Sequence, residues 1–403
     1  MPLRLASRIR SIQSSPSSAA VDRTLQARRT GRDIVSLIVG EPDFDTPTHI
    51  CEAACAAIRA GKTRYTQTAG TEELRRAVID KLKRENGLSY GLDNVIVSSG
   101  AKQVLFNALL ATLEDGDEVL VPAPYWVSYP DMVRVAGGVP VVIAADPANG
   151  LKVSAHAFEA AITTRTRWLV LNFPSNPSGT CYSAVEMAQI GAVLERHPQV
   201  MLLTDEVYEH IRYDNTPMVH PLVVAPQLKD RTLVVNGVSK TYAMTGWRIG
   251  YAAGPVELVQ AMTTLQSQST SNASTVSQAA ALAALTGPQD FIADWVCIYR
   301  QRRDRVLQLL EGVEGLRCIE PQGAFYIYVD CAKLIGRVSA DGQSMSTDND
   351  VVSHLFDNAG VAVMAGSAFG ASPYFRLSIA VAMETLEEAC ARISKAVRSL
   401  HVA

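Results

Sequence analysis

The stretch Asn236-Gly-Val-Ser-Lys-Thr-Tyr-Ala-Met-Thr-Gly-Trp-Arg-Ile-Gly-Tyr251 follows a short apolar run, residues 232–235, that is typical of a buried strand. The turn after this run carries Ser239 and Lys240, and Arg248 comes eight residues later. A lysine amine attacks an aldehyde only when it is neutral, so its pKa must be lowered by burial or by a nearby cation. Lys240 has apolar neighbours and Arg248 in the same stretch. An isolated lysine of this kind more often extends its amine to solvent, so both interpretations stay open at this point.

Two further stretches indicate ligand binding at the ends of strands. Residues 200–205 form an apolar run that ends in Asp205, and open α/β sheets bind ligands at the carboxyl ends of their strands. An acid also ends many strands for solubility alone. Asn94-Val-Ile-Val-Ser-Ser-Gly-Ala-Lys-Gln103 predicts a strand that enters a helix, whose N-terminus could bind an anion or simply be capped.

Composition restricts the class of protein. The 403 residues are enough for about two domains, and 48% of them are hydrophobic. No apolar run approaches the roughly 18 residues of a membrane span. The net charge of −3 gives no electrostatic reason to expect binding to nucleic acid or to an anionic membrane. The seven cysteines are dispersed without a C-x-x-C motif, which favours a reducing, cytoplasmic compartment and no metal site.

Periodicity and capping signals predict several elements outside these stretches. We expect helices over residues 22–29, 48–60, 71–86 and 291–311, with Thr71 as an N-cap, and strands over 323–329 and 374–379. Residues 331–350 are polar and mixed, which favours a surface excursion. The first 20 residues are rich in Arg and Ser, as in transit peptides, but we favour a short amphipathic segment over residues 5–12.

The motif Ser239-Lys-x-x-x-Met-x-Gly-Trp-Arg-x-Gly-Tyr251 resembles the cofactor-lysine signature of class I aminotransferases, which use pyridoxal 5'-phosphate (PLP). The likeness extends from about Ser36 to about Arg376 and includes several short motifs in the family's order. It implies an α/β protein of PLP-dependent transferase fold type I. A mostly parallel central sheet flanked by helices would form the large domain, beside a smaller α+β domain. The expected limits are 1–45 for an N-terminal segment and part of the small domain, 46–285 for the large domain, and 286–403 for the rest of the small domain.

The resemblance also implies roles in cofactor chemistry. Lys240 would bond to the PLP aldehyde and later move the substrate α-proton. Asp205 would keep the pyridine nitrogen protonated, which makes the ring an electron sink. Asn176, in the turn Phe173-Pro-Ser-Asn-Pro-Ser-Gly179, and Tyr208 would hydrogen-bond to the phenolic oxygen of PLP. From the residues alone, an Asn between prolines is ordinary turn chemistry.

Further residues would hold the ends of the cofactor. The expected phosphate site is the helix N-terminus at Ser99, Gly100 and Ala101, with Ser239 and Arg248 also in contact with PLP. Trp126 would stack on the cofactor ring, although core packing is the commoner fate of a tryptophan. The tyrosine of the Arg-Tyr-Thr element, Tyr65, would reach the phosphate of the neighbouring subunit, which makes the active unit a homodimer.

Three residues would bind substrate. Arg376 lies among apolar residues, so its guanidinium needs an anionic partner or a cavity; the resemblance implies that it binds the substrate α-carboxylate, whereas an internal salt bridge is the alternative. Gly40, in Gly-Glu-Pro-Asp-Phe44, would contact the same carboxylate. The resemblance also implies that Lys102, in Ser-Gly-x-Lys-Gln, binds a distal carboxylate; the alternative is a surface lysine in a first helical turn, where a cation is mildly unfavourable. Trp126 and Asn176 are expected to line the substrate side as well.

The expected activity is transamination between an amino acid and 2-oxoglutarate, with aspartate as the favoured donor. Prephenate or a broader range of substrates is the first alternative, and a PLP-dependent carbon–sulfur lyase is the second. A non-catalytic binding module is disfavoured, because Lys240 and Asp205 are both retained. No nucleic-acid, membrane or metal partner is expected.

Overall fold

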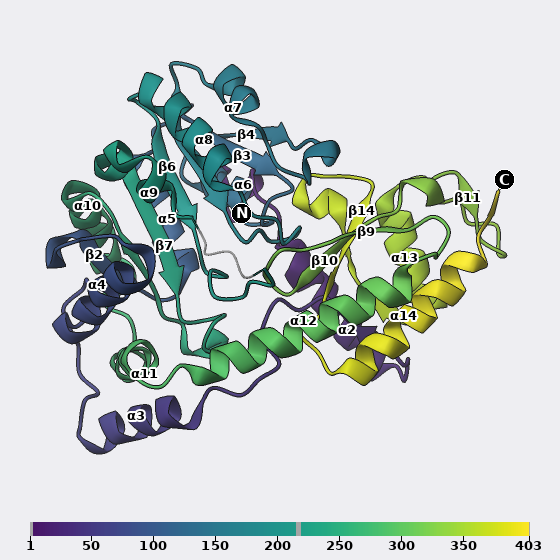
Figure 1. Ribbon diagram of the computed structural model, residues 1–403, viewed down its shortest axis with the longest axis horizontal. Helices are drawn as coiled ribbons and strands as arrows, with labels where there is room; N and C mark the ends of the chain where they lie inside the picture. The colour runs from purple at the N-terminus through teal and green to yellow at the C-terminus, as the bar shows by residue number, and fades with distance from the viewer. Residues whose placement is uncertain (1–2, 215–218, 403) are drawn as a thin grey trace.

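The chain folds around two separate sheets. The computed structural model describes residues 3–214 and 219–402. A seven-stranded sheet and its helices form the larger part, and a four-stranded sheet forms the core of the smaller part (Figure 1). The long helix α12 (Asp290–Leu310) runs from one part to the other.

The large sheet has the order β2-β8-β7-β6-β5-β3-β4. Its strands are β2 (Val95–Ser98), β3 (Glu118–Ala123), β4 (Val139–Ala144), β5 (Thr166–Asn172), β6 (Met201–Asp205), β7 (Thr232–Gly237) and β8 (Gly250–Ala253). Only β8 runs antiparallel to its neighbours, β2 and β7, whereas the β3, β4, β5, β6 and β7 pairings are parallel. The expected mostly parallel sheet is confirmed. Because β5, β6 and β7 are parallel, their carboxyl ends share one edge.

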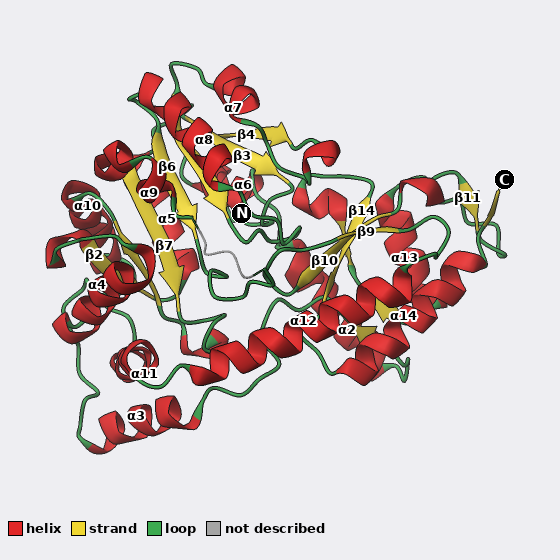
Figure 2. Ribbon diagram, in the orientation of Figure 1, coloured by secondary structure: helices red, strands yellow, loops and turns green. Residues whose placement is uncertain are grey.

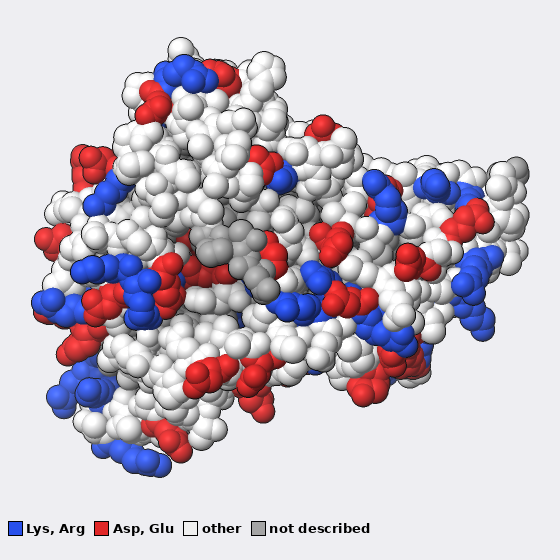
Figure 3. All heavy atoms as spheres, viewed as in Figure 1, with Lys and Arg blue, Asp and Glu red and all other residues white. Residues whose placement is uncertain are grey.

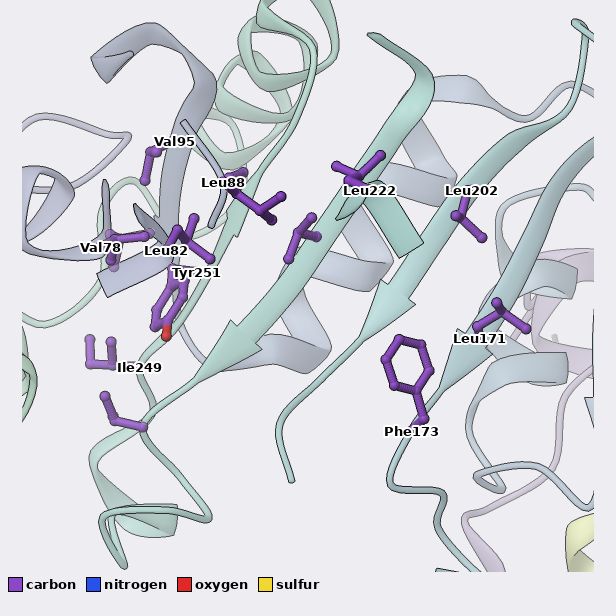
Figure 4. Packing of buried hydrophobic residues seen from close by; sticks show 14 of the residues in the cluster. Val78, Leu82, Leu88, Val95, Leu171, Phe173, Leu202, Leu222, Ile249 and Tyr251 are labelled. Atoms are coloured by element: carbon purple, nitrogen blue, oxygen red, sulfur yellow. The ribbon is translucent and has the colours of Figure 1, made fainter. Parts of the chain in front are cut away.

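Apolar residues cover both faces of this sheet, which explains why its strands are continuously hydrophobic. Along β5, Leu169 and Leu171 point to one face, and Trp168 and Val170 to the other. The first face is covered by α4 (Glu72–Asn86), α7 (Ala155–Ala161), α8 (Ala184–Arg196), α9 (Pro221–Val224) and α11 (Thr275–Thr286), and α3 (Thr48–Arg59) packs on α11. The second packs against α5 (Ala101–Thr112), α6 (Tyr129–Val135) and α10 (Val256–Ser267). Figure 2 shows this helix–sheet–helix layering, and Figure 4 shows the packing of the first face from nearby.

The smaller part contains the antiparallel sheet β13-β14-β10-β9. Its strands are β9 (Arg317–Ile319), β10 (Tyr326–Asp330), β13 (Met364–Ala365) and β14 (Tyr374–Ser378), with α12, α13 (Asp348–Asn358) and α14 (Met383–Arg398) packed around them. Two short pairs lie beside it: β1 (Val35–Ser36) with β12 (Val361–Ala362), and β11 (Arg337–Val338) with β15 (His401–Val402). Arg376 on β14 is the cross-strand partner of both Tyr328 and Met364.

The predicted elements are largely confirmed, including the Thr71 cap, which accepts from the backbone N–H of Leu74. The N-terminal helix was predicted too short: α2 spans Pro16–Arg29, because Pro16 occupies its first turn, where a missing N–H costs nothing. The segment 331–350 is only partly a surface excursion, since Leu334 and Met345 are fully buried. Helix α1 (Ser7–Arg10) buries no residue, as expected for a segment lying on the surface.

None of the helices in the described residues is long and apolar enough to cross a membrane. On the face shown in Figure 3, basic and acidic side chains are mixed over the surface. The domain limits proposed from the resemblance, at residues 45 and 285, stay predictions.

A buried lysine ties helix α4 to the large sheet near the Lys240 turn. The side chain of Lys81 is 1% exposed, and its amine donates to Glu209 and, at 2.9 Å, to Asn86. Although burial raises the pKa of Glu209, the charge of Lys81 holds it below its usual value. His210 lies beside Glu209 and contacts Thr241 Oγ1 at 3.1 Å. The buried ammonium of Lys81 therefore neutralises the charge of Glu209.

We predict that Lys81→Met lowers the free energy of unfolding by about 3–5 kcal/mol, because it leaves Glu209 buried without a cation. Arg76→Met is the matched control, since Arg76 pairs with Glu72 on the exposed face of the same helix and should cost less than about 1 kcal/mol. Denaturant unfolding at neutral pH measures both values. An equal loss in the two variants would contradict the prediction.

Candidate active site

A cavity of about 500 Å³ lies where the carboxyl ends of β5, β6 and β7 face the small sheet. Its size suits a small organic ligand. Eleven of the residues singled out in the sequence line it: Gly40, Ala101, Lys102, Trp126, Asn176, Asp205, Tyr208, Ser239, Lys240, Arg248 and Arg376. The fold therefore brings together predicted residues that are up to 336 positions apart in the chain, Gly40 and Arg376.

Three expected residues do not line this cavity. The backbone N–H of Ser99 donates to the side chain of Gln103 at 2.7 Å, and the N–H of Gly100 donates to Ser98 O at 2.8 Å. These two donors are therefore engaged within the chain. Tyr65 is 90% exposed and lies away from the cavity of its own chain.

Lys240 follows β7 in a tight turn and points into the cavity. Its Nζ donates to the backbone carbonyl of Gly40 at 2.6 Å. Burial lowers the pKa of Lys240 to about 8, and the charges of Arg248 and Arg376 act in the same direction. The amine is therefore much more nucleophilic near neutral pH than an ordinary lysine amine.

Asp205 ends β6 and is almost completely buried. Its Oδ2 accepts a hydrogen bond from the hydroxyl of Tyr129 at 2.7 Å, and its backbone carbonyl accepts from Asn172 Nδ2. Burial raises the pKa of Asp205 to about 6, against the effect of the Tyr129 hydrogen bond. A cationic N–H group from a ligand would stabilise the ionised form of this carboxylate.

Arg376 is 3% exposed and forms no ion pair with an acid in the described part of the chain. Its Nη1 donates to Asn176 Oδ1 at 2.9 Å, and its Nη2 donates to Ile38 O at 2.5 Å. The guanidinium lies 4.4 Å from the ring centre of Tyr326 and 4.9 Å from that of Phe369. The alternative of an internal salt bridge is therefore wrong. A buried cation that faces a cavity without a counter-ion is a site for an anionic ligand.

A second part of the lining is also cationic. Helix α5 directs its N-terminus at it through Ala101, and Ser239 and Arg248 lie on the same side. Gly100 has φ +91°, and a Cβ there would collide with the Arg248 guanidinium. A helix terminus, a hydroxyl and a guanidinium together could bind a second anion.

Lys102 and Trp126 form a third feature of the lining. Lys102 Nζ lies 4.7 Å from the ring centre of Trp126, and Trp126 makes an edge contact with Tyr129. Burial, followed by the charge of Arg248, lowers the pKa of Lys102. Both residues line the cavity, and Lys102 is also partly exposed to solvent.

Several lining residues were missed in the sequence. Tyr129 holds Asp205, Asn172 accepts from the backbone N–H of Asn176 at 2.8 Å, and Tyr326 shares a hydrogen bond of 2.8 Å with Tyr208. Helix α2 adds Ser17 and Ser18, together with other residues of its first two turns. No local pattern distinguishes these residues, because their partners lie far away in the chain. The exception is α2: Pro16 is a typical first helical residue, so the true start of this helix could have been recognised in the sequence.

Three comparisons identify the family. The model of the family "Aminotransferase class I and II" matches residues 32–393. An aspartate aminotransferase of Rhizobium meliloti (strain 1021) is 51% identical over 97% of this chain and 95% of its own length. An aspartate/prephenate aminotransferase of Cereibacter sphaeroides is also 51% identical, over 95% of this chain and 96% of its own length.

A solved structure agrees with these sequence matches. The crystal structure of the aspartate aminotransferase from Rhizobium meliloti superposes with a TM-score of 0.97 at 50% identity, covering 99% of this chain and all of that one. The resemblance first carried by the motif around Lys240 therefore extends to the whole backbone. The chain belongs to the class I and II aminotransferases.

Proposed function

We propose that this protein binds PLP at Lys240 and transfers the amino group of aspartate to 2-oxoglutarate. The observation that carries the proposal is the meeting of three groups in one cavity: an amine with a pKa of about 8, a buried acid and a buried guanidinium without a counter-ion. These are the nucleophile, the ring partner and the carboxylate site that a PLP-dependent transaminase needs.

The lining fits PLP at each of its polar groups. Lys240 would hold the aldehyde carbon. Asp205 would pair with the ring nitrogen, and the anion site at the N-terminus of α5, with Ser239 and Arg248, would take the phosphate. Tyr208 and Asn176 would lie near the phenolic oxygen, with Trp126 against the ring. Because Ser99 and Gly100 N–H groups are engaged internally, the N–H groups of Ala101 and Lys102 are better placed to serve the phosphate.

When bound, PLP supplies an aromatic ring that accepts the electron pair left behind as the substrate α-proton departs. The protein residues manage the proton and the orientation. Lys240 is the general base that would take the α-proton and the general acid that would deliver it to C4′, the former aldehyde carbon of PLP. Both roles require a pKa near the working pH. Arg376 binds the α-carboxylate, and the aromatic rings around it exclude water.

Aspartate is favoured because Lys102, beside Trp126, adds a further basic group to the lining that could bind a second carboxylate. Prephenate is the second candidate, and the printed name of the Cereibacter sphaeroides relative supports it. Its second carboxylate could use the same amine. A carbon–sulfur lyase would need the same PLP contacts, but it would not need Lys102 to bind the distal carboxylate of a dicarboxylate substrate.

The active unit proposed is a homodimer in the cytoplasm. Tyr65 is 90% exposed in the single chain, and it would become useful only against the phosphate of a neighbouring subunit. The domain limits at residues 45 and 285 would then separate a small part that carries Arg376 and Gly40 from a large part that carries Lys240.

We predict that the purified protein absorbs in the visible region and that borohydride bleaches this band and fixes the cofactor on Lys240. Aspartate with 2-oxoglutarate should give the highest kcat/KM in a panel of amino donors, with prephenate tested as an acceptor. Lys240→Ala should lose both the band and the activity. Release of ammonia and pyruvate from cystathionine without an oxo acid would instead indicate the lyase.

We predict that the rate at which the cofactor-free enzyme captures PLP rises with pH around 8, since only the neutral amine reacts. At pH 7 about a tenth of Lys240 would be neutral, against about one in 3,000 for a lysine with a pKa of 10.5. Stopped-flow absorbance from pH 6 to 10 measures the rate. A blocked free lysine treated in parallel corrects for the titration of PLP itself. A rise that matches the free lysine would exclude the lowered pKa.

We predict that Lys102→Ala raises KM for aspartate by about ten- to a hundredfold, because it removes a charged hydrogen bond to the distal carboxylate. KM for alanine, which has no second carboxylate, should stay unchanged. Lys83→Ala, on the exposed face of α4, is the control and should affect neither donor. Equal losses for aspartate and alanine would show that Lys102 is not the selecting residue.

A further inference from the structure

The hydrogen bonds of Arg376 leave few of its donors free. Nη1 donates to Asn176, and Nη2 donates twice, to Ile38 O at 2.5 Å and to Met364 Sδ at 3.4 Å. In the described part of the chain, Nε has no partner. The N–H of Nε and the second N–H of Nη1 therefore remain available as donors, whereas both N–H groups of Nη2 already have acceptors.

This count restricts how a carboxylate can bind. A guanidinium holds a carboxylate with two parallel N–H groups, which belong either to Nε and Nη2 or to Nη1 and Nη2. Both arrangements use Nη2. A carboxylate that binds Arg376 with both oxygens must therefore displace Ile38 O or Met364 Sδ.

The sulfur is the acceptor that is easier to displace. A thioether is a weak acceptor and loses little when it is left without a donor, whereas a buried backbone carbonyl without a partner is costly. Ile38 is 2% exposed, so water would not readily replace Arg376 at its carbonyl. The flanking rings of Tyr326 and Phe369 keep the guanidinium in place while its partners change.

We infer that Met364 is a positioning residue whose sulfur holds Arg376 in place before substrate binds and yields this donor to the substrate α-carboxylate. The position of the sulfur is well defined, because Met364 is 3% exposed and is the cross-strand partner of Arg376. The same sulfur accepts from the hydroxyl of Ser17 at 3.5 Å, and Ser17 lines the cavity. One apolar side chain thus holds two cavity-facing donors from different elements without competing strongly with a substrate. The inference rests on the proposed role of Arg376 in binding the α-carboxylate.

The test is equilibrium binding of unreactive carboxylates to the PLP-loaded enzyme, followed by the change in cofactor absorbance. Maleate and propionate are the probes, because one carries two carboxylates and the other carries one. Met364→Leu keeps the volume and removes the acceptor. It should bind both probes about two- to fivefold more tightly, because only the free enzyme loses a weak hydrogen bond.

Two further variants make the result specific. Met364→Gln places an amide oxygen, a strong acceptor, at the same reach, and it should bind both probes about tenfold more weakly. Met345→Leu is the matched control for a methionine change in a fully buried position of the small part, and it should leave binding unchanged. In steady-state assays, Met364→Leu should lower KM for aspartate and for alanine by the same factor while kcat stays constant.

Weaker or unchanged binding of the probes by Met364→Leu would overturn the inference, as would an effect on maleate alone. A wild-type enzyme that has no visible band or no response to either probe would instead overturn the proposed function. The two failures are therefore distinguishable before any variant is compared.

Discussion

The segment Ile38–Gly40 holds the two most important cations of the cavity on two of its backbone carbonyls. Ile38 O accepts from Arg376 on the small sheet, and Gly40 O accepts from Lys240 at the end of β7. A side chain at position 40 would collide with the hydroxyl of Tyr326, so only glycine lets the carbonyl come this close. Carbonyl dipoles stabilise each cation without neutralising it. Both groups consequently remain available to an anion or an aldehyde.

The positions of these cations follow from how the two sheets are built. The parallel strands β5, β6 and β7 end along one edge of the large sheet, which places Asp205 and Lys240 beside each other. The antiparallel strand β14 brings Arg376 from the other side, about 140 positions further along the chain than Lys240. Burial at this junction then shifts both pKa values toward neutrality, downward for Lys240 and upward for Asp205.

Weak and strong hydrogen-bond acceptors have different tasks in this site. The hydroxyl of Tyr129 donates a hydrogen bond of 2.7 Å to the carboxylate of Asp205 and fixes its position. The donors of Arg376 must instead change partners when a substrate arrives, and a thioether beside a backbone carbonyl allows one of them to do so.

The sequence by itself determined the layered fold and half of the residues that line the cavity. Apolar runs that end in Asp205 or in the turn at Lys240 indicate buried parallel strands, since local periodicity follows directly from burial on both sheet faces. The tertiary structure alone decided which groups meet. Tyr129 contacts Asp205 across 76 positions, Met364 and Ile38 share one guanidinium, and α2 reaches the cavity. Such contacts depend on the register of the strands and on how the chain crosses between the sheets, and no short stretch of sequence encodes these features. Each of the contacting residues, taken alone, is also compatible with ordinary core packing.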